Sequence, residues 1–368
     1  MSWSRLAINT SLVVASCFFA ILLVEVIFKF VPKRENIDIY HWDYRYMLFS
    51  NSNGGSSFNN IRNFFVYQPN ATIHNKTFYL VNEQWIKEYD YLFPSNNFGL
   101  VQTNNIQANV PSILLLGDSY TEGQGAPPWF ELFKKSYQQK SLQPINGGLV
   151  GTGFQQWKFL HDYLLSKNII VKKLVVIFIS GDYVRNVWNF PDYKHACLAD
   201  YSKCVGNEDF YGMPPDDKLN EFLGVLRGYR EKHLYKKDGA VKKLLHRLFP
   251  GTRLALKYLR ESLKQRQSKD AINILANREA IRQFIATYSN NVLFVHIPQK
   301  DEILNHAVSP LGKMLRNDIE VFGGKYYDGQ ILCGLTKGDF FENDGHPNVS
   351  GYSKISACVT DAVNKTWQ

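Results

Sequence analysis

The chain has 368 residues, of which 45% are hydrophobic and 20% are charged. These proportions exclude an intrinsically disordered chain and a collagen-like repeat, and the length allows one large domain or two modest ones. The formal net charge is +9, yet residues 227–269 alone hold fourteen basic and three acidic residues, a net of +11, so the remainder sums to about −2. Because the basic surplus is local and no nucleic-acid-binding module is recognisable, we expect no nucleic-acid partner.

The first apolar segment, residues 6–28, is long enough to cross a membrane. Its 23 residues contain few polar side chains, and at about 1.5 Å per residue they span a hydrocarbon core of about 30 Å. A cleaved signal peptide is the alternative, but its apolar region ends after about 7–15 residues at a small-residue site. Here residues 18–24 continue the apolar run beyond such a site. We therefore predict an uncleaved transmembrane anchor over residues 1–34.

Two features give opposite indications of the compartment. The positive-inside bias weakly favours a cytoplasmic body, because the apolar run is followed by three basic residues, Lys29, Lys33 and Arg34. The cysteines beyond the anchor form two local pairs, Cys197 with Cys204 and Cys333 with Cys358. Such pairs suit disulfides in an oxidising compartment, with four free thiols as the alternative, and neither pair has the spacing of a zinc site. We expect two disulfides, no metal, and an extracytoplasmic body (periplasmic, luminal or extracellular).

The body reads as one α/β domain preceded by an extension. Residues 35–110 are rich in Asn, Tyr, Phe and Ser and predict irregular structure with short strands that packs on the core. Short apolar runs follow at 113–116, 174–179 and 292–295, and each is typical of a buried parallel strand. Helical patterns at 129–138 and 154–165 separate the first two runs. This alternation predicts a three-layer αβα sandwich with a parallel sheet over residues 111–368.

A basic helical segment, residues 217–270, interrupts the alternation. Its leucines recur at helical spacing among lysines and arginines. One interpretation is a solvated helical insertion, which could partly act as a lid. The other is a helix whose basic face lies on anionic lipid head groups near the anchor.

Three short motifs carry the chemistry. The apolar run that ends at Gly117 is followed by Asp118 and Ser119, which puts a hydroxyl at the carboxyl edge of the sheet, where open α/β folds place their sites. A glycine-rich stretch, 146–153, permits close backbone approach but lacks the spacing of a nucleotide-binding loop. Near the C-terminus, Asp344 and His346 can converge from one loop, so that a carboxylate orients an imidazole that activates the serine.

These motifs, in this order, resemble those of the SGNH hydrolases, the superfamily of GDSL-type esterases and lipases. Residues 117–120, 146–151 and 344–348 match the family's first, glycine and last blocks, and the resemblance covers about residues 111–362. It implies a flavodoxin-like fold and no cofactor. It also implies a nucleophile at Ser119, a general base at His346 and an orienting carboxylate at Asp344.

The resemblance further implies an oxyanion hole formed by the backbone N–H groups of Ser119 and Gly151 and by an asparagine. The sequence departs from the family here, because Gly181 stands where the asparagine is expected. Either Asn186 or another amide substitutes, or the site is slow or inactive. One such donor is typically worth 100- to 1,000-fold in rate.

The resemblance therefore predicts a membrane-anchored serine esterase acting on O-acyl groups of carbohydrate or lipid, with the membrane and the acyl ester as its partners. Two alternatives remain open. One is an O-acyltransferase that uses the same triad with a sugar hydroxyl in place of water. The other is a catalytically inactive binding module that keeps the fold.

Overall fold

The computed structural model describes residues 44–126, 129–137, 141–233 and 269–367, together with 16, 19 and 23–26. The chain divides into two units, 1–38 with 231–269 and 39–230 with 270–368, and the sheets and candidate site lie in the second. The predicted anchor and the part of the basic segment between 234 and 268 lie outside the described residues, apart from 16, 19 and 23–26. Within the described part of the chain, no helix is both long and apolar enough to span a bilayer.

The centre of the second unit is a parallel sheet of five strands. They are β6 (Pro111–Gly117), β7 (Gln143–Gly148), β8 (Ile170–Phe178), β10 (Val292–His296) and β11 (Lys325–Asp328). Their spatial order is β11-β10-β8-β6-β7, and every neighbouring pair is parallel. Numbered along the chain this is 2-1-3-4-5, the flavodoxin-like doubly wound order. The α/β class predicted from the apolar runs is confirmed.

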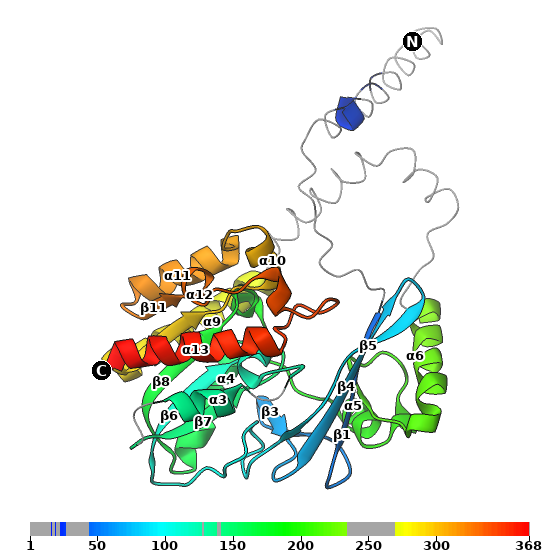
Figure 1. Ribbon diagram of the computed structural model, residues 1–368, viewed down its shortest axis with the longest axis horizontal. Coiled ribbons are helices and arrows are strands. Elements are labelled where there is room, and N and C mark those ends of the chain that lie inside the picture. The colour runs from blue at the N-terminus through cyan, green and yellow to red at the C-terminus, as the bar shows by residue number, and fades with distance from the viewer. Residues whose placement is uncertain are drawn as a thin grey trace, which may run out of the picture. The chain divides into compact units, whose positions relative to one another are not determined.

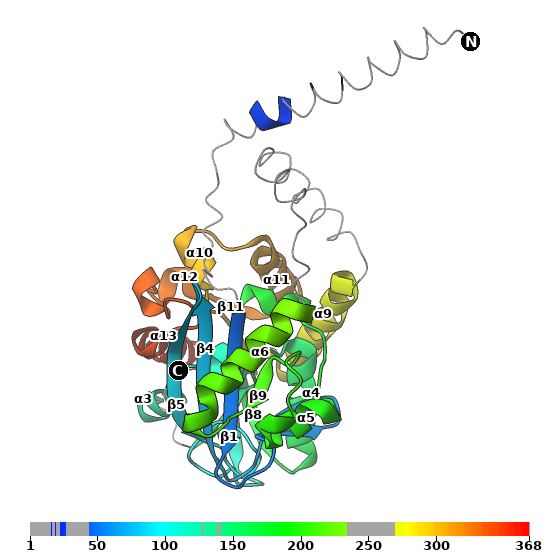
Figure 2. The same cartoon turned by 90° about the vertical axis from the view of Figure 1, so that its right-hand side faces the viewer.

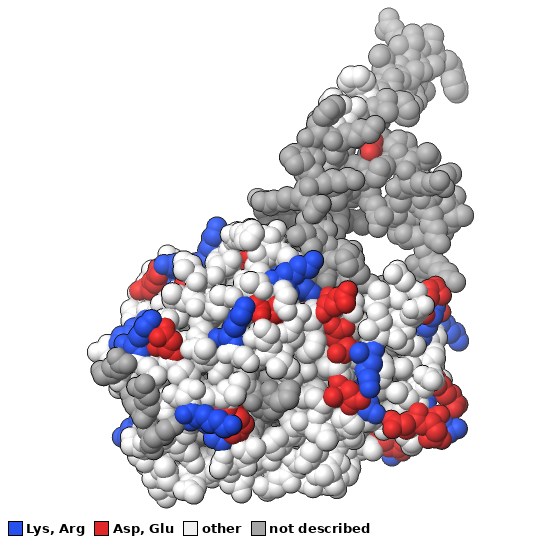
Figure 3. Space-filling model, in the orientation of Figure 1, with Lys and Arg blue, Asp and Glu red and all other residues white. Residues whose placement is uncertain are grey.

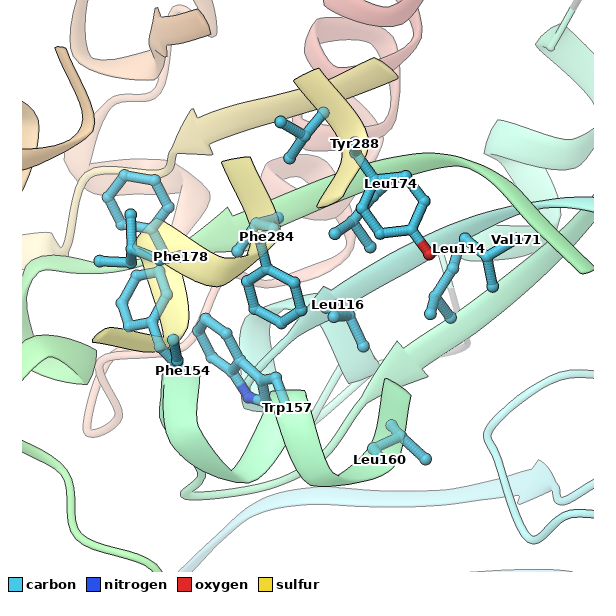
Figure 4. Packing of buried hydrophobic residues seen from close by; sticks show 14 of the residues in the cluster. Leu114, Leu116, Phe154, Trp157, Leu160, Val171, Leu174, Phe178, Phe284 and Tyr288 are labelled. Carbon is cyan, nitrogen blue, oxygen red and sulfur yellow. The ribbon is translucent and has the colours of Figure 1, made fainter. Parts of the chain in front are cut away.

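Helices cover both faces of this sheet, as Figure 1 shows. Leu114 and Leu116 of β6 face a core formed with α4 (Phe154–Ser166), α9 (Lys269–Tyr288) and α11 (Pro310–Val321). Ile113 and Leu115 point the other way, toward α3 (Phe130–Ser136) and α13 (Val349–Trp367). Because successive side chains of a strand point to opposite faces, alternate residues of the apolar run in β6 pack into the two cores. Figure 4 shows the first core, where Trp157 of α4 and Phe284 of α9 lie among the strand leucines.

Shorter elements connect these layers. The remaining helices are α2 (Ser119–Glu122), α5 (Asp192–Ala199), α6 (Leu219–His233), α10 (Lys300–Leu304) and α12 (Gly329–Leu332). Single 3₁₀ turns are η1 (Ser180–Val184), η2 (Tyr201–Lys203), η3 (Asp216–Lys218), η4 (Ser289–Asn291) and η5 (Lys337–Asp339).

A second sheet is built mostly from the N-terminal extension. Its order is β5-β4-β1-β9, with β1 (Tyr44–Asn51), β4 (Thr72–Val81), β5 (Gln84–Pro94) and β9 (Phe210–Gly212); β2 (Phe58–Ile61) and β3 (Phe64–Tyr67) form a separate hairpin. The first three strands have 8, 10 and 11 residues, so the extension is more regular than the short strands expected from its sequence.

Burial on both faces explains this difference for β1. Met47 and Phe49 of β1 pack into an aromatic cluster on one face. Tyr46 and Leu48 pack on the other face with residues of α6, which crosses the strands in Figure 2. Apolar and aromatic residues therefore follow one another without the polar alternation that marks a half-exposed strand.

Both predicted disulfides are present, Cys197–Cys204 and Cys333–Cys358. They indicate an oxidising, extracytoplasmic compartment. Charged side chains of both signs are interspersed on the face drawn in Figure 3, in keeping with a basic surplus that is concentrated in residues 227–269.

Candidate active site

Ser119 lies where β6 gives way to α2, at the carboxyl edge of the central sheet. The turn is tight. A Cβ on Gly117 would lie 1.9 Å from Thr121 Oγ1 and 2.3 Å from the carbonyl oxygen of Ile177. Asp118 caps α2 by accepting a hydrogen bond of 2.9 Å from the Tyr120 N–H. The side chain of Ser119 is thereby held in a buried position at the wall of a cavity.

The structure brings together the three residues predicted as a triad. His346 Nε2 lies 2.8 Å from Ser119 Oγ, and His346 Nδ1 lies 2.8 Å from Asp344 Oδ1. Asp344 and His346 lie in the loop between η5 and α13. The Tyr120 hydroxyl donates a hydrogen bond to the Gly345 carbonyl and so holds this loop at the edge of the sheet. In this geometry the imidazole can take the serine proton while the carboxylate fixes the other ring nitrogen.

The carboxylate of Asp344 is buried but well supported. Its second oxygen accepts a hydrogen bond of 3.0 Å from the Tyr89 hydroxyl on β5, and that hydroxyl accepts one of 2.6 Å from Gln124 Nε2. Burial by itself raises the pKa of Asp344, but the adjacent His346 ring and the charge of Arg45 lower it below its ordinary value. Asp344 is therefore ionised at neutral pH.

The glycine-rich stretch forms the loop after β7. A Cβ on Gly148 would lie 2.2 Å from the Glu122 backbone nitrogen, so only glycine lets the loop approach α2 this closely. Gly151 has a φ of +70°, a left-handed conformation that favours glycine, and it lines the same cavity as Ser119.

Glu122 holds this loop and was not anticipated from the sequence, although it lies within the serine motif. Its carboxyl oxygens accept hydrogen bonds of 2.8 Å from the Val150 N–H and from the Tyr67 hydroxyl. Burial raises the pKa of Glu122 to about 8, against the lowering effect of those two hydrogen bonds.

The Arg185 guanidinium lies between two carboxylates, one of which belongs to Asp118, the residue before Ser119. Arg185 Nη1 lies 3.0 Å from Asp118 Oδ2 and 2.9 Å from Asp182 Oδ1, and it donates to the Thr152 carbonyl at 3.0 Å. Burial and then the charge of Asp118 raise the pKa of Asp182 well above its ordinary value.

The structure does not bring Asn186 to the cavity. Arg185, the residue after η1, has extended backbone, and Asn186 lies exposed, donating to the Val187 carbonyl at 3.1 Å. Gly181 lies in η1 and donates its N–H to Gln299 Oε1 at 3.1 Å. The side-chain amide near Gly181 therefore comes from Gln299, which no pattern in the sequence singled out.

The cavity over Ser119 has a volume of about 420 Å³. Its lining combines the serine and histidine with polar and aromatic side chains, among them Arg45, Asp209, Gln299, Trp188 and Phe210. Among the described residues no cluster of three His, Cys, Asp or Glu side chains could hold a metal ion.

Comparisons with known proteins find similar solved structures at low sequence identity. No protein-family model matches the sequence, and no curated protein matches it. Among solved structures, the chain is similar to a member of the lipolytic protein G-D-S-L family from Veillonella parvula, with 12% identity and a TM-score of 0.34, covering 69% of this chain and 99% of that one. It is also similar to a putative arylesterase from Agrobacterium tumefaciens, with 12% identity and a TM-score of 0.33, covering 70% and 99%.

Proposed function

We propose that this protein is a serine esterase that hydrolyses carboxylic esters through an acyl-enzyme. The observation that carries the proposal is the chain of contacts Ser119 Oγ to His346 Nε2 and His346 Nδ1 to Asp344 Oδ1, each 2.8 Å long. A serine hydroxyl is a weak nucleophile at neutral pH unless a neighbouring base takes its proton, and His346 is within hydrogen-bond distance to do so.

The reaction proceeds in two halves. Ser119 Oγ attacks the ester carbonyl carbon as its proton passes to His346 Nε2, and a tetrahedral oxyanion forms. The C–O bond to the alcohol then breaks, the alcohol leaves with the proton from His346, and the acyl group stays on Ser119. Water attacks this acyl-enzyme, gives its proton to His346, and the acid is released as Ser119 regains the proton. The backbone N–H groups of Ser119 and Gly151 stabilise both oxyanions.

We propose a short O-acyl group on a carbohydrate as the substrate. A volume of about 420 Å³ fits a small acyl group with part of a sugar better than a long lipid chain. Arg45 and Asp209 line this cavity with Trp188, so sugar hydroxyls have charged hydrogen-bonding partners and a sugar face has an aromatic ring to pack against.

We further propose that residues 1–34 anchor the enzyme in a membrane and that the basic segment beyond α6 lies near anionic lipid. The support is the length of the apolar run 6–28 and the net charge of +11 over 227–269. The two disulfides favour an enzyme that faces the oxidising side of that membrane.

The experiment uses the full chain purified in detergent. We expect a fluorophosphonate probe to label the wild type, and a chromogenic acetyl ester to be hydrolysed by it, whereas Ser119→Ala should show neither reaction. Transfer of the acetyl group to a hydroxyl of an added glycan, in place of the release of acetate, would identify an acyltransferase. Folded wild-type protein that neither takes the label nor cleaves the ester would refute acyl chemistry.

A further inference from the structure

Gln299 is a polar residue at the cavity that the triad does not account for. It caps the start of α10 just after β10, and its side chain lines the same cavity as Ser119 and Gly151. The cavity therefore contains a side-chain amide from the segment that follows β10, and β10 lies on the other side of β8 from β6, the strand that precedes Ser119.

The orientation of this amide is fixed by its oxygen. Gln299 Oε1 accepts a hydrogen bond of 3.1 Å from the Gly181 N–H. Because a carboxamide carries its two donors on the nitrogen, Nε2 is the end of the group left to donate. Among the described residues Nε2 has no hydrogen-bond partner, and a cavity-lining donor of this kind is available to a ligand.

The amide also fills the space beside a residue without a side chain. A Cβ built on Gly181 would lie 3.6 Å from Gln299 Oε1 and 3.9 Å from Nε2. These are ordinary contact distances, and the φ of Gly181 is not in the left-handed region. A side chain at position 181 would therefore project toward the place that the Gln299 amide occupies.

The buried carboxylate of Glu302 fixes the positions of both Gln299 and the segment that contains Gly181. Glu302 Oε2 accepts from the Gln299 backbone N–H at 3.0 Å, and Glu302 Oε1 accepts from the Ser180 hydroxyl at 2.6 Å. Ser180 precedes Gly181, and its hydroxyl also lies 3.1 Å from Nε2 of the buried His296. The Gly181 N–H and the Gln299 amide are thus preorganised, which is what an electrostatic catalytic group requires.

We propose that Gln299 Nε2 donates a hydrogen bond to the oxyanion that forms when Ser119 attacks the ester, as a third donor beside the backbone N–H groups of Ser119 and Gly151. This inference rests on the proposed esterase function. It assigns catalysis to an amide carried by the β10–α10 junction, which stands in for the side chain that position 181 lacks.

The test compares kcat and KM for a chromogenic acetyl ester. Gln299→Met keeps the length of the side chain and removes the donor, together with the acceptor of the Gly181 N–H. We expect kcat to fall about 100-fold with KM changed by less than about threefold, since one oxyanion donor is typically worth 100- to 1,000-fold. Gln283→Met makes the same change on the surface of α9, where the amide donates to Glu279, and should leave both constants unchanged.

A second variant distinguishes a catalytic role of Gln299 from a purely structural one. In the double variant Gly181→Asn with Gln299→Ala, an amide would project from position 181 into the vacated space, and we expect kcat at least 10-fold above that of Gln299→Ala alone. A wild-type kcat in Gln299→Met, a loss confined to KM, or no rescue in a folded double variant would each overturn the assignment while Ser119 still labels. A wild type that never labels would instead overturn the esterase function and this assignment together.

Discussion

The Asp344 carboxylate is buried, and its two oxygens have different partners. One oxygen faces the His346 ring and the other accepts from Tyr89. A buried carboxyl in an apolar setting would take up a proton, and here the neighbouring charges keep its pKa low instead. The residue can therefore hold the imidazole in one tautomer, with the proton on Nδ1 and the lone pair of Nε2 toward the serine.

Replacing this carboxylate by an amide should remove that control. We expect Asp344→Asn to lower kcat about 10,000-fold, because an amide NH₂ facing Nδ1 favours the tautomer that cannot accept the serine proton. The measurement is ester hydrolysis at neutral pH with folding checked by circular dichroism. Asp361→Asn makes the same change at a surface carboxylate that pairs with Lys365 and should be silent. A loss below about 10-fold in Asp344→Asn would contradict the assigned role.

Glu122 should make stability depend on pH. Its pKa is raised from 4.5 to about 8 by burial, so the folded state binds one more proton than the unfolded state between these values. The stabilising contribution is complete below about pH 4.5 and is lost as the pH rises toward about 8, by up to about 1.4 kcal/mol per pH unit.

Glu122→Gln keeps the shape and has no titrating proton. We expect its free energy of urea unfolding to lack the decline that the wild type shows between about pH 5 and about pH 8. Parallel curves for the two proteins over this range would show that Glu122 is already ionised in the folded state.

At the scale of elements, the loop with Asp344 and His346 is closed by a covalent link. Cys333 ends α12, Cys358 lies in α13, and the disulfide between them encloses a sequence separation of 25 residues. Within that span Asp339 accepts from Thr336 and Lys354. The segment that carries this loop to Ser119 is thus fixed at both of its ends.

Removing this disulfide should destabilise the protein. We expect Cys333→Ser with Cys358→Ser to lower the free energy of unfolding by about 3 kcal/mol, since the unfolded chain regains the entropy of a long loop. Cys197→Ser with Cys204→Ser opens a loop of separation 7 and should cost less. Urea unfolding of both double variants checks the order, and equal losses would count against loop entropy as the cause.

The sequence predicted the central sheet better than the second sheet, for a physical reason. The runs in β6, β8 and β10 are apolar throughout because both faces are buried, and such runs bounded by glycine or polar residues have few other interpretations. The strands β1, β4 and β5 mix aromatic, polar and charged residues, and the sequence alone does not reveal which residues pair.

The residues of the candidate site also differ in whether the sequence could predict them. Ser119, Asp344 and His346 lie in short motifs whose residue types and order predict their meeting. Gln299 and Tyr89 reach the site only through tertiary packing, from the β10–α10 junction and from the second sheet. No local pattern marks such residues, because their role depends on which strand edge faces the cavity.

For the molecule as a whole, the candidate site is assembled from both sheets of the second unit. The central sheet supplies Ser119, while β5 of the second sheet supports the loop that carries the histidine. Glu88 accepts from the backbone and side chain of Asn343 at 2.9 and 2.8 Å, and Tyr89 donates to Asp344. The N-terminal extension therefore supports the candidate site, which is not confined to the domain predicted for residues 111–368.

A single hydroxyl on the second sheet should therefore affect chemistry on the first. We expect Tyr89→Phe to lower kcat about 10-fold with KM unchanged, because a hydrogen bond to a charged group is worth about 1.5–3 kcal/mol and orients Asp344. Tyr46→Phe removes a hydroxyl from the opposite face of that sheet, among the residues packed with α6, and should leave kcat unchanged. If both variants lost activity in proportion to their melting temperatures, the second sheet would act on stability alone; a loss specific to Tyr89→Phe at unchanged melting temperature supports a direct link to the triad.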